Sequence, residues 1–346
     1  MMNNLCLTMQ SPTEIKDLLF KLEGSNIGKF LTQDELDVLI KHSQVTEFKP
    51  DDVILRQGKE SQFLYIIIDG EVYVTARILG QGITNIETLS VGNFLGEISF
   101  IEKVPCPTSA QAKTEVQCLM INNTYFELLT TCYPIIKYKI LNALSRQVCC
   151  RLKRIHDEVT DRIKNSEMAS LSLFAKFVNT FNQPKLVSFE EASVVKEQLW
   201  QEPIFQFFTE AELNELFNHM ELLEANKDCK LIHEGEKRAS CYIVVYGAVQ
   251  SSIVHDNKMA KLSVIGPGTL FAGVACVDSD SSYTVTFTTC EQAILLRLSG
   301  TVLEHLQNEK PQIWYKLYSL ICTSLVALEK SIDKLDIRLH IEAYNR

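Results

Sequence analysis

The chain has 346 residues, of which 46% are hydrophobic and 22% charged, and its formal net charge is −9. This length fits about two domains of roughly 150 residues each, and the composition supplies ordinary apolar cores with no sign of disorder. The acidic balance argues against a surface that follows nucleic-acid phosphates, so we expect no nucleic-acid partner.

Neither membrane insertion nor a metal site is expected from the local sequence. No apolar run reaches the roughly 18 residues of a membrane span, and residues 1–10 lack the charged and apolar regions of a secretion signal. The 11 cysteines are scattered without any C-x-x-C spacing, and adjacent residues such as Cys149 and Cys150 point about 100° apart on a helix. We therefore expect a cytoplasmic protein with reduced thiols, no membrane partner and no metal.

The second half of the chain repeats the first at an offset of 177 residues. Polar, glycine and aromatic positions recur together, in the pairs Thr32/Thr209, Glu35/Glu212, His42/His219, Gly58/Gly235, Tyr65/Tyr242, Gly70/Gly247 and Lys139/Lys316. So many matches at one offset indicate the tandem duplication of one domain. We expect a first domain at 11–165, a linker at 166–187 and a second domain at 188–346.

Each copy is predicted to begin with helices. Apolar residues lie at helical spacing near the start of the first copy, at Ile15, Leu18, Leu19 and Leu22. We expect this amphipathic helix to recur in the second copy, because Ser11 and Ser188 begin both. Thr32 followed by Glu35 predicts the capped start of a further helix.

The middle of each copy is predicted to be a β-roll. Between about 46 and 122, period-two and short apolar runs alternate with glycines. The predicted strands are 53–57, 63–68, 71–79, 85–89 and 116–121. Many short strands without intervening helices predict a small antiparallel sandwich or jelly roll.

A long helix is predicted to close each copy. From Tyr125 to about Lys164 the helical period returns, and Pro134 is expected to separate a short helix from the long one. Both long helices carry an apolar seam with spacings of three and four. The seams are Leu141, Leu144, Val148, Leu152, Ile155, Val159 and Ile163 in the first copy, and Leu317, Ile321, Leu325, Leu328, Ile332, Leu335 and Leu339 in the second.

The predicted fold class is therefore α+β, with two tandem β-roll (jelly-roll) domains, each with N-terminal helices and a long C-terminal helix. Packing of each long helix on its own barrel would explain part of its seam. Pairing of the two long helices in an intrachain pseudo-dimer would explain the rest.

The order of helix, roll and long helix, with the segment FLGEISFIEKVPCPTSAQA at 94–112, resembles the cyclic-nucleotide-binding domain family. That family includes the bacterial catabolite activator and the regulatory subunits of cyclic-AMP-dependent kinase. The resemblance implies that this segment is a phosphate-binding cassette, in which backbone N–H groups of a short helix face a cyclic phosphate. A glutamate of the cassette binds the ribose 2′-hydroxyl, and an arginine pairs with the phosphate.

By this resemblance the first cassette keeps the glutamate and lacks the arginine. Glu97 falls at the glutamate position and Cys106 at the arginine position. On the long helix, His156 falls where the family contacts the base, although a solvated histidine is the simpler interpretation. The candidate ligand-binding residues of the first domain are Gly96, Glu97, Ile98, Ser99, Cys106, Pro107, Thr108, Ser109 and His156.

The second cassette, GTLFAGVACVDSDSSYTV at 268–285, departs further from the family pattern. Ala272 and Gly273 fall at the glycine and glutamate positions, and Ser282 is expected at the arginine position. Asp278 and Asp280 add negative charge that opposes an anion. The weaker candidates here are Gly273, Val274, Ser282, Tyr283 and Thr284.

No nucleophile elbow, P-loop or H-E-x-x-H motif occurs, so we expect no enzymatic activity and no cofactor. One hypothesis is a non-enzymatic regulatory protein whose first domain senses cyclic AMP, cyclic GMP or a nucleoside, with a degenerate second domain. The alternative is a ligand-free interaction scaffold whose paired long helices engage a protein partner that the sequence does not identify.

Overall fold

A computed structural model of the chain describes residues 12–78, 82–164, 182–192, 194–255, 258–277 and 282–344. The chain divides into two compact units, residues 1–147 and 148–346, and the division falls within one long helix. Within the described ranges no helix is long and apolar enough to cross a membrane.

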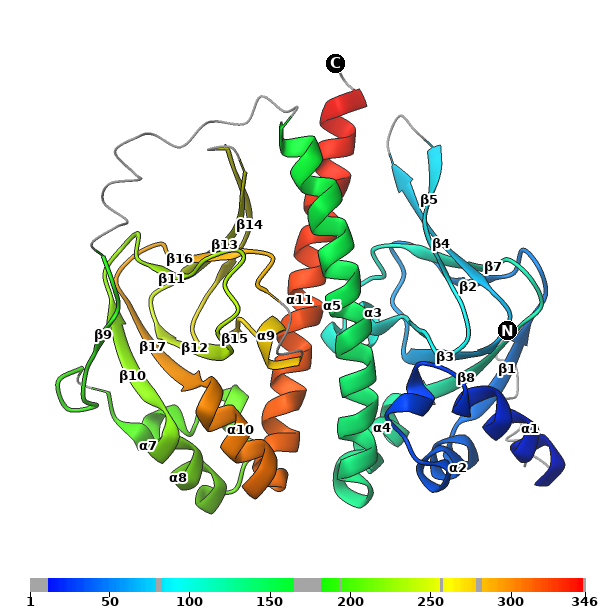
Figure 1. Ribbon diagram of the computed structural model, residues 1–346, viewed down its shortest axis with the longest axis horizontal. Helices are drawn as coiled ribbons and strands as arrows, with labels where there is room; N and C mark the ends of the chain where they lie inside the picture. The colour runs from blue at the N-terminus through cyan, green and yellow to red at the C-terminus, as the bar shows by residue number, and fades with distance from the viewer. Residues whose placement is uncertain are drawn as a thin grey trace. The chain divides into compact units, whose positions relative to one another are not determined.

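The first unit contains helices, eight strands and helices again (Figure 1). The elements are α1 (Pro12–Glu23), η1 (Ile27–Lys29), α2 (Gln33–His42), β1 (Gln44–Phe48), β2 (Val53–Leu55), β3 (Phe63–Asp69), β4 (Val72–Ile78), β5 (Gly82–Leu89), β6 (Phe94–Leu95), α3 (Glu97–Glu102), β7 (Ser109–Ala112), β8 (Val116–Asn122), α4 (Asn123–Cys132) and the start of α5 (Pro134–Lys164).

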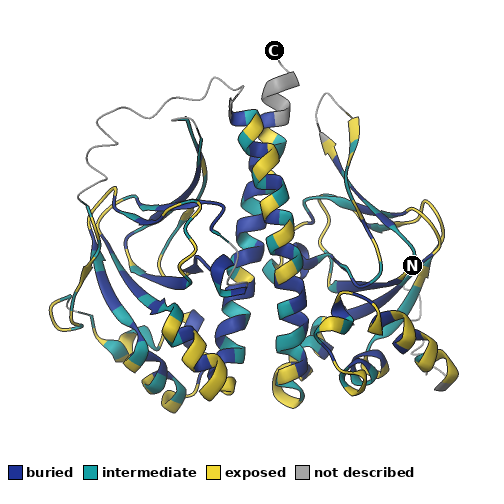
Figure 2. Cartoon of the chain, viewed as in Figure 1, coloured by how far each residue is buried: buried dark blue, intermediate teal, exposed yellow. Residues whose placement is uncertain are grey.

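The eight strands form two four-stranded antiparallel sheets, in the orders β1-β8-β3-β6 and β2-β7-β4-β5. Side chains alternate across each strand, and the apolar residues that face the other sheet form a buried core between the two layers. Figure 2 marks the buried positions along these strands. Val74 and Ala110 lie on paired strands in this core, with 8% and 2% of their surfaces exposed.

Helix α2 begins with a reciprocal cap. The Thr32 hydroxyl accepts a hydrogen bond from the Glu35 N–H, and the Glu35 carboxylate accepts one from the Thr32 N–H at 2.7 Å. Lys139 of α5 lies 2.7 Å from the same carboxylate. The second unit repeats this arrangement with Thr209, Glu212 and Lys316.

The second unit repeats the roll, and it includes residues 148–164 of α5. Its further elements are β9 (Lys185–Leu186), α7 (Lys196–Leu199), η2 (Pro203–Phe205), α8 (Glu210–His219), β10 (Glu221–Ala225), β11 (Lys230–Ile232), β12 (Ser240–Tyr246), β13 (Val249–His255), β14 (Lys258–Ile265), β15 (Leu270–Phe271), α9 (Val274–Val277), β16 (Thr286–Thr289), β17 (Ala293–Ser299), α10 (Gly300–Glu309) and α11 (Pro311–Tyr344). Its sheets have the orders β15-β12-β17-β10-β9 and β11-β16-β13-β14.

At the equivalent positions of the second unit, which the structure describes except for residue 193, the leading helix does not recur, contrary to our expectation. Ser188 and Glu191 do form a reciprocal cap, but only turns follow it as far as residue 192, and α7 has four residues against the twelve of α1. The β-branched pair Val194–Val195 directly precedes α7, and such residues are weaker helix formers. Most of the expected linker, from 166 to 181, lies outside the described residues.

The long helices bury the predicted seams along their length. Every seam residue named above is at most 9% exposed. Within the second unit, Arg151 of α5 forms an ion pair with Glu329 of α11, and Arg162 lies 3.6 Å from Asp336. Residues 148–164 of α5 therefore pack along α11, whereas the expected pseudo-dimer stays a prediction.

These observations confirm the predicted α+β class with two tandem rolls. All five strands predicted in the first copy are present, and Pro134 does begin the long helix after a short one. The strands β1, β6 and β7 were not individually predicted, because they are short or carry polar residues between small ones.

Candidate functional site

The first cassette starts at a sharp turn between β6 and α3. Gly96 has a φ of 84°, in the left-handed region, and a Cβ atom there would lie 3.1 Å from the Phe63 carbonyl oxygen. The turn places Glu97 in the first turn of α3, where the residue is only 5% exposed. The positive end of a helix dipole favours a carboxylate at this position. The Gly–Glu pair expected from the sequence therefore holds a buried carboxylate in a defined place.

A serine ties helix α3 to the segment just before β3. The Ser99 hydroxyl accepts a hydrogen bond of 2.8 Å from the Ser61 N–H. Ile98, the neighbouring candidate, is 4% exposed and contributes apolar packing. Of these two candidates, Ser99 positions the cassette and Ile98 anchors it to the core.

At the arginine position of the first cassette lies the thiol of Cys106, which is surrounded by apolar side chains. The Cys106 N–H donates to the Lys59 carbonyl and the Cys106 carbonyl accepts from the Gly58 N–H, both at 2.9 Å. The side chain is 5% exposed and packs in the cluster that contains Leu55 and Ala110. Burial raises the pKa of Cys106, and the nearby Glu97 charge acts in the same direction. This position therefore supplies a neutral thiol.

The remaining first-domain candidates follow directly along the chain. Pro107 and Thr108 are half-buried and connect Cys106 to β7. Ser109 begins β7, and its hydroxyl accepts a hydrogen bond of 3.0 Å from the Gln57 N–H. These residues hold the end of the cassette against the turn after β2.

The outer face of the β2-β7-β4-β5 sheet carries an open cavity of about 560 Å³ that includes Ser109. Ser109 alternates with the core residue Ala110, so its side chain lies on the face opposite the core. Arg56 and Arg77 also line the cavity. Neither arginine was predicted as a site residue, because both lie outside the cassette segment at 94–112.

His156 is separated from the other first-domain candidates by the division of the chain. It belongs to the unit 148–346, whereas residues 96–109 belong to the unit 1–147. Its Nε2 atom lies 2.8 Å from Glu234, and its side chain is 13% exposed. Burial lowers its pKa, but the hydrogen bond and charge of Glu234 outweigh burial and the net pKa is raised. His156 is thus a partnered residue of the second unit, not a solvated one.

The second cassette keeps the backbone of the first turn without its chemistry. In the β3–β6 and β12–β15 pairings, Leu95 and Phe271 face equivalent tyrosines, so the offset between copies is 176 here. Ala272 has a φ of 67°, like Gly96. This equivalence agrees with the expected placement of Ala272 and Gly273.

The expected placement of Ser282 at the arginine position is wrong. Tyr283 exchanges backbone hydrogen bonds of 2.8 and 2.9 Å with the turn at 235–236, as Cys106 does with the turn at 58–59. The offset has returned to 177, so the second cassette is one residue longer between its start and this point. Tyr283 therefore occupies the arginine position. Asp278, Asp280 and the other residues of 278–281 lie outside the described residues.

The Tyr283 side chain is committed to internal hydrogen bonds. The residue is 1% exposed. Its one hydroxyl hydrogen is shared between the Ser240 carbonyl at 2.8 Å and the Ala272 carbonyl at 3.2 Å, and its oxygen accepts from the Ser240 N–H at 3.3 Å. Burial raises its pKa, which keeps the phenol neutral. Thr284, the next residue, is 8% exposed and Ser282 is half-buried.

The glutamate position of the second cassette cannot accept a side chain without movement. A Cβ atom at Gly273 would lie 2.8 Å from Cγ2 of Ile321 and 3.0 Å from the Ser324 hydroxyl oxygen, both in α11. Val274, which follows, is 3% exposed. The close approach of α11 thus excludes a buried carboxylate here.

Comparison with known families agrees with this arrangement. The profile of the cyclic nucleotide-binding domain family matches residues 45–131 and 222–310, just over half of the chain. The chain therefore belongs to the cyclic nucleotide-binding domain family, in which it carries two tandem domains.

Individual relatives are distant. The chain is 29% identical over 126 residues to the cAMP-dependent protein kinase regulatory subunit of Candida albicans, which covers 36% of this chain and 25% of that protein. It is 27% identical over 120 residues to the HTH-type transcriptional regulator Cmr of Mycobacterium tuberculosis, covering 34% and 48%. The chain thus spans less than half the length of these two curated relatives.

Among solved structures, the chain is similar to the guanosine-bound regulatory subunit of a cAMP-independent protein kinase A from Trypanosoma cruzi. That similarity has 16% sequence identity and a TM-score of 0.30, and it covers 88% of this chain and 87% of the other.

Proposed function

We propose that this chain is a non-enzymatic regulatory protein whose first domain binds a nucleoside-like ligand and whose second domain binds none. The observation that carries the proposal is the pairing of a buried carboxylate, Glu97, with a neutral thiol, Cys106, at the two polar positions of one cassette. The carboxylate suits a ribose hydroxyl, which donates a hydrogen bond. The thiol offers no charge to a phosphate.

The missing cation sets the expected selectivity. A hydrogen bond to a charged group contributes about 1.5–3 kcal/mol, and leaving an anion unpaired costs more. That free energy corresponds to a roughly ten- to hundred-fold loss in affinity. We therefore expect adenosine or guanosine to bind more tightly than cyclic AMP or cyclic GMP.

The second domain is proposed to have lost its ligand. Gly273 provides no carboxylate and lies too close to Ile321 to be replaced by a larger residue. The hydroxyl of Tyr283 already satisfies the backbone around it. One ligand per chain is therefore the expected stoichiometry.

Calorimetric titration with adenosine, guanosine, cyclic AMP and cyclic GMP tests the proposal. Glu97→Ala should abolish binding, whereas Glu102→Ala, which removes the other carboxylate of α3, should not. Cys106→Arg should shift the preference toward the cyclic nucleotides, with Cys106→Ala as its folding control. Tighter binding of cyclic AMP than of adenosine by the unaltered protein would contradict the charge argument.

A second candidate function is the ligand-free scaffold. It is favoured by the burial of Cys106 and Tyr283, because both arginine positions are filled by side chains that pack within the protein. Absence of heat with all four ligands, in a protein shown to be folded, would remove the sensor hypothesis for these ligands. The surfaces of the two domains would then be the functional elements.

A further inference from the structure

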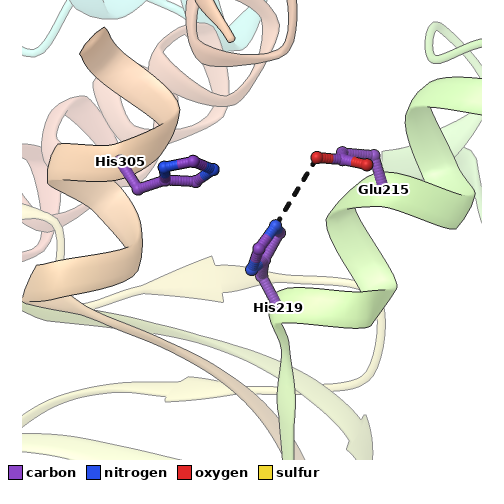
Figure 3. A group of neighbouring side chains, drawn as sticks. All are labelled: Glu215, His219 and His305. Carbon is purple, nitrogen blue, oxygen red and sulfur yellow. Dashed lines mark ion pairs between the residues drawn. The ribbon is translucent and has the colours of Figure 1, made fainter. Parts of the chain in front are cut away.

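Three potential metal ligands from two helices converge in the second domain (Figure 3). Glu215 and His219 are separated by four residues on α8, so their side chains lie on one face of that helix. His305 projects toward them from α10. One ligand atom from each residue lies within 4.8 Å of the other two.

The distances are close to those of a metal site. A tetrahedral zinc ion with bonds of about 2.0–2.1 Å separates two ligand atoms by about 3.3 Å. Nε2 of His219 is already 3.6 Å from Oε1 of Glu215. The two imidazole rings have centroids 5.1 Å apart, so a modest rotation of His305 would bring its nitrogen into range.

The ligand set selects a class of metal. Two imidazoles and one carboxylate are borderline and hard donors, which suit Zn²⁺ and disfavour Ca²⁺ and Mg²⁺. Three protein ligands leave a fourth tetrahedral position for water. We propose that Glu215, His219 and His305 form a Zn²⁺ site that links α8 to α10.

Lys310 occupies part of this site in the structure. Its ammonium group lies 2.8 Å from Oε1 of Glu215. Metal binding would have to displace this ammonium. Because Lys310 directly precedes α11, occupation of the site would also release a contact at the start of that helix.

The first domain provides an internal comparison. At the equivalent positions it has Val38, His42 and Leu128, and His42 stacks on Tyr125 with ring centroids 5.5 Å apart. One imidazole with two aliphatic residues cannot bind zinc. The site is therefore specific to the second copy, and His42→Ala is a matched control.

Zinc titration against a competing chelator tests the proposal, with cobalt absorption as a second readout. We expect one Zn²⁺ per chain, a loss of at least tenfold in affinity for His219→Ala and for His305→Ala, and no change for His42→Ala. Lys310→Ala should tighten binding severalfold, because it removes the competing ammonium.

The cysteines are the main alternative source of zinc affinity. Bound Co²⁺ at the proposed site should show no thiolate-to-metal charge-transfer band, and alkylation of the thiols should leave the stoichiometry unchanged. The proposal is overturned if alkylation abolishes binding, or if both histidine variants bind zinc as the unaltered protein does. The zinc titration does not depend on the outcome of the nucleoside titrations, because Glu97 and the three proposed zinc ligands lie in different domains.

Discussion

The ion pair between Arg151 and Glu329 is deeply buried. Glu329 has a side chain that is 0% exposed, and that of Arg151 is 11% exposed. Removal of one partner of such a pair leaves a buried charge without its counter-ion, which costs about 3–5 kcal/mol. We expect Glu329→Ala to lower the free energy of unfolding of the second unit by that amount.

The chain offers a selective probe for this measurement. It has 2 tryptophans, Trp200 and Trp314, and both lie in the second unit. Urea unfolding followed by tryptophan fluorescence therefore reports on the unit that contains the ion pair. Glu158→Ala is the matched control, because Glu158 pairs with Arg154 on the same helix with side chains 44% and 34% exposed. Such exposed pairs contribute about 0.5 kcal/mol or less.

A double substitution separates the cost of a stranded charge from the value of the pair. Arg151→Met with Glu329→Leu removes both charges and keeps an apolar volume, so most of the lost stability should return. The reasoning is refuted if Glu329→Ala costs less than about 1 kcal/mol. It is also refuted if the double variant is as unstable as the single one.

Three further predictions are tested by urea unfolding. Tyr283→Phe should lower the free energy of unfolding by about 1–3 kcal/mol, because the buried partners of the hydroxyl lose their hydrogen bonds. An unchanged unfolding midpoint would contradict the stabilising role of these hydrogen bonds. The pKa of His156 is raised above 6.5 in the folded protein. The His156–Glu234 pair therefore makes its full contribution to the free energy of unfolding below pH 6.5, and this contribution is lost as the pH rises through the folded-state pKa. Glu234→Gln should flatten that decline, and an identical pH profile would count against it. Thr32→Ala and Thr209→Ala should each cost about 1 kcal/mol by circular dichroism, and no effect would argue against the caps.

The hydrophobic periodicity of the sequence predicted most of the fold, because the pattern of each element occurs in both copies of the duplication. The caps at Thr32 and Thr209 are local, since each needs only a glutamate three residues later. The long helix seams were equally readable from spacing. Short strands such as β6 were not, because two residues carry no period and form a strand only through pairing with β3.

The cassettes show where counting along the chain fails. Glu97 and Cys106 were placed by sequence alone, and the structure brings them together with Ser99. In the second cassette a single inserted residue moved the arginine position from Ser282 to Tyr283. Only the backbone hydrogen bonds with the turn at 235–236 revealed this shift, because neither Ser282 nor Tyr283 resembles the arginine that would have aligned the position.

The sequence by itself determined the duplication, the α+β rolls and the loss of the arginine, since these depend on local pattern and residue identity. The tertiary structure decided which distant residues meet. His305 lies close to Glu215 and His219, and α11 packs against Gly273, although the spacing of these residues in the sequence predicts neither contact. The physical reason is that helix packing sets neighbours across long stretches of chain, and sequence spacing records only neighbours within one element.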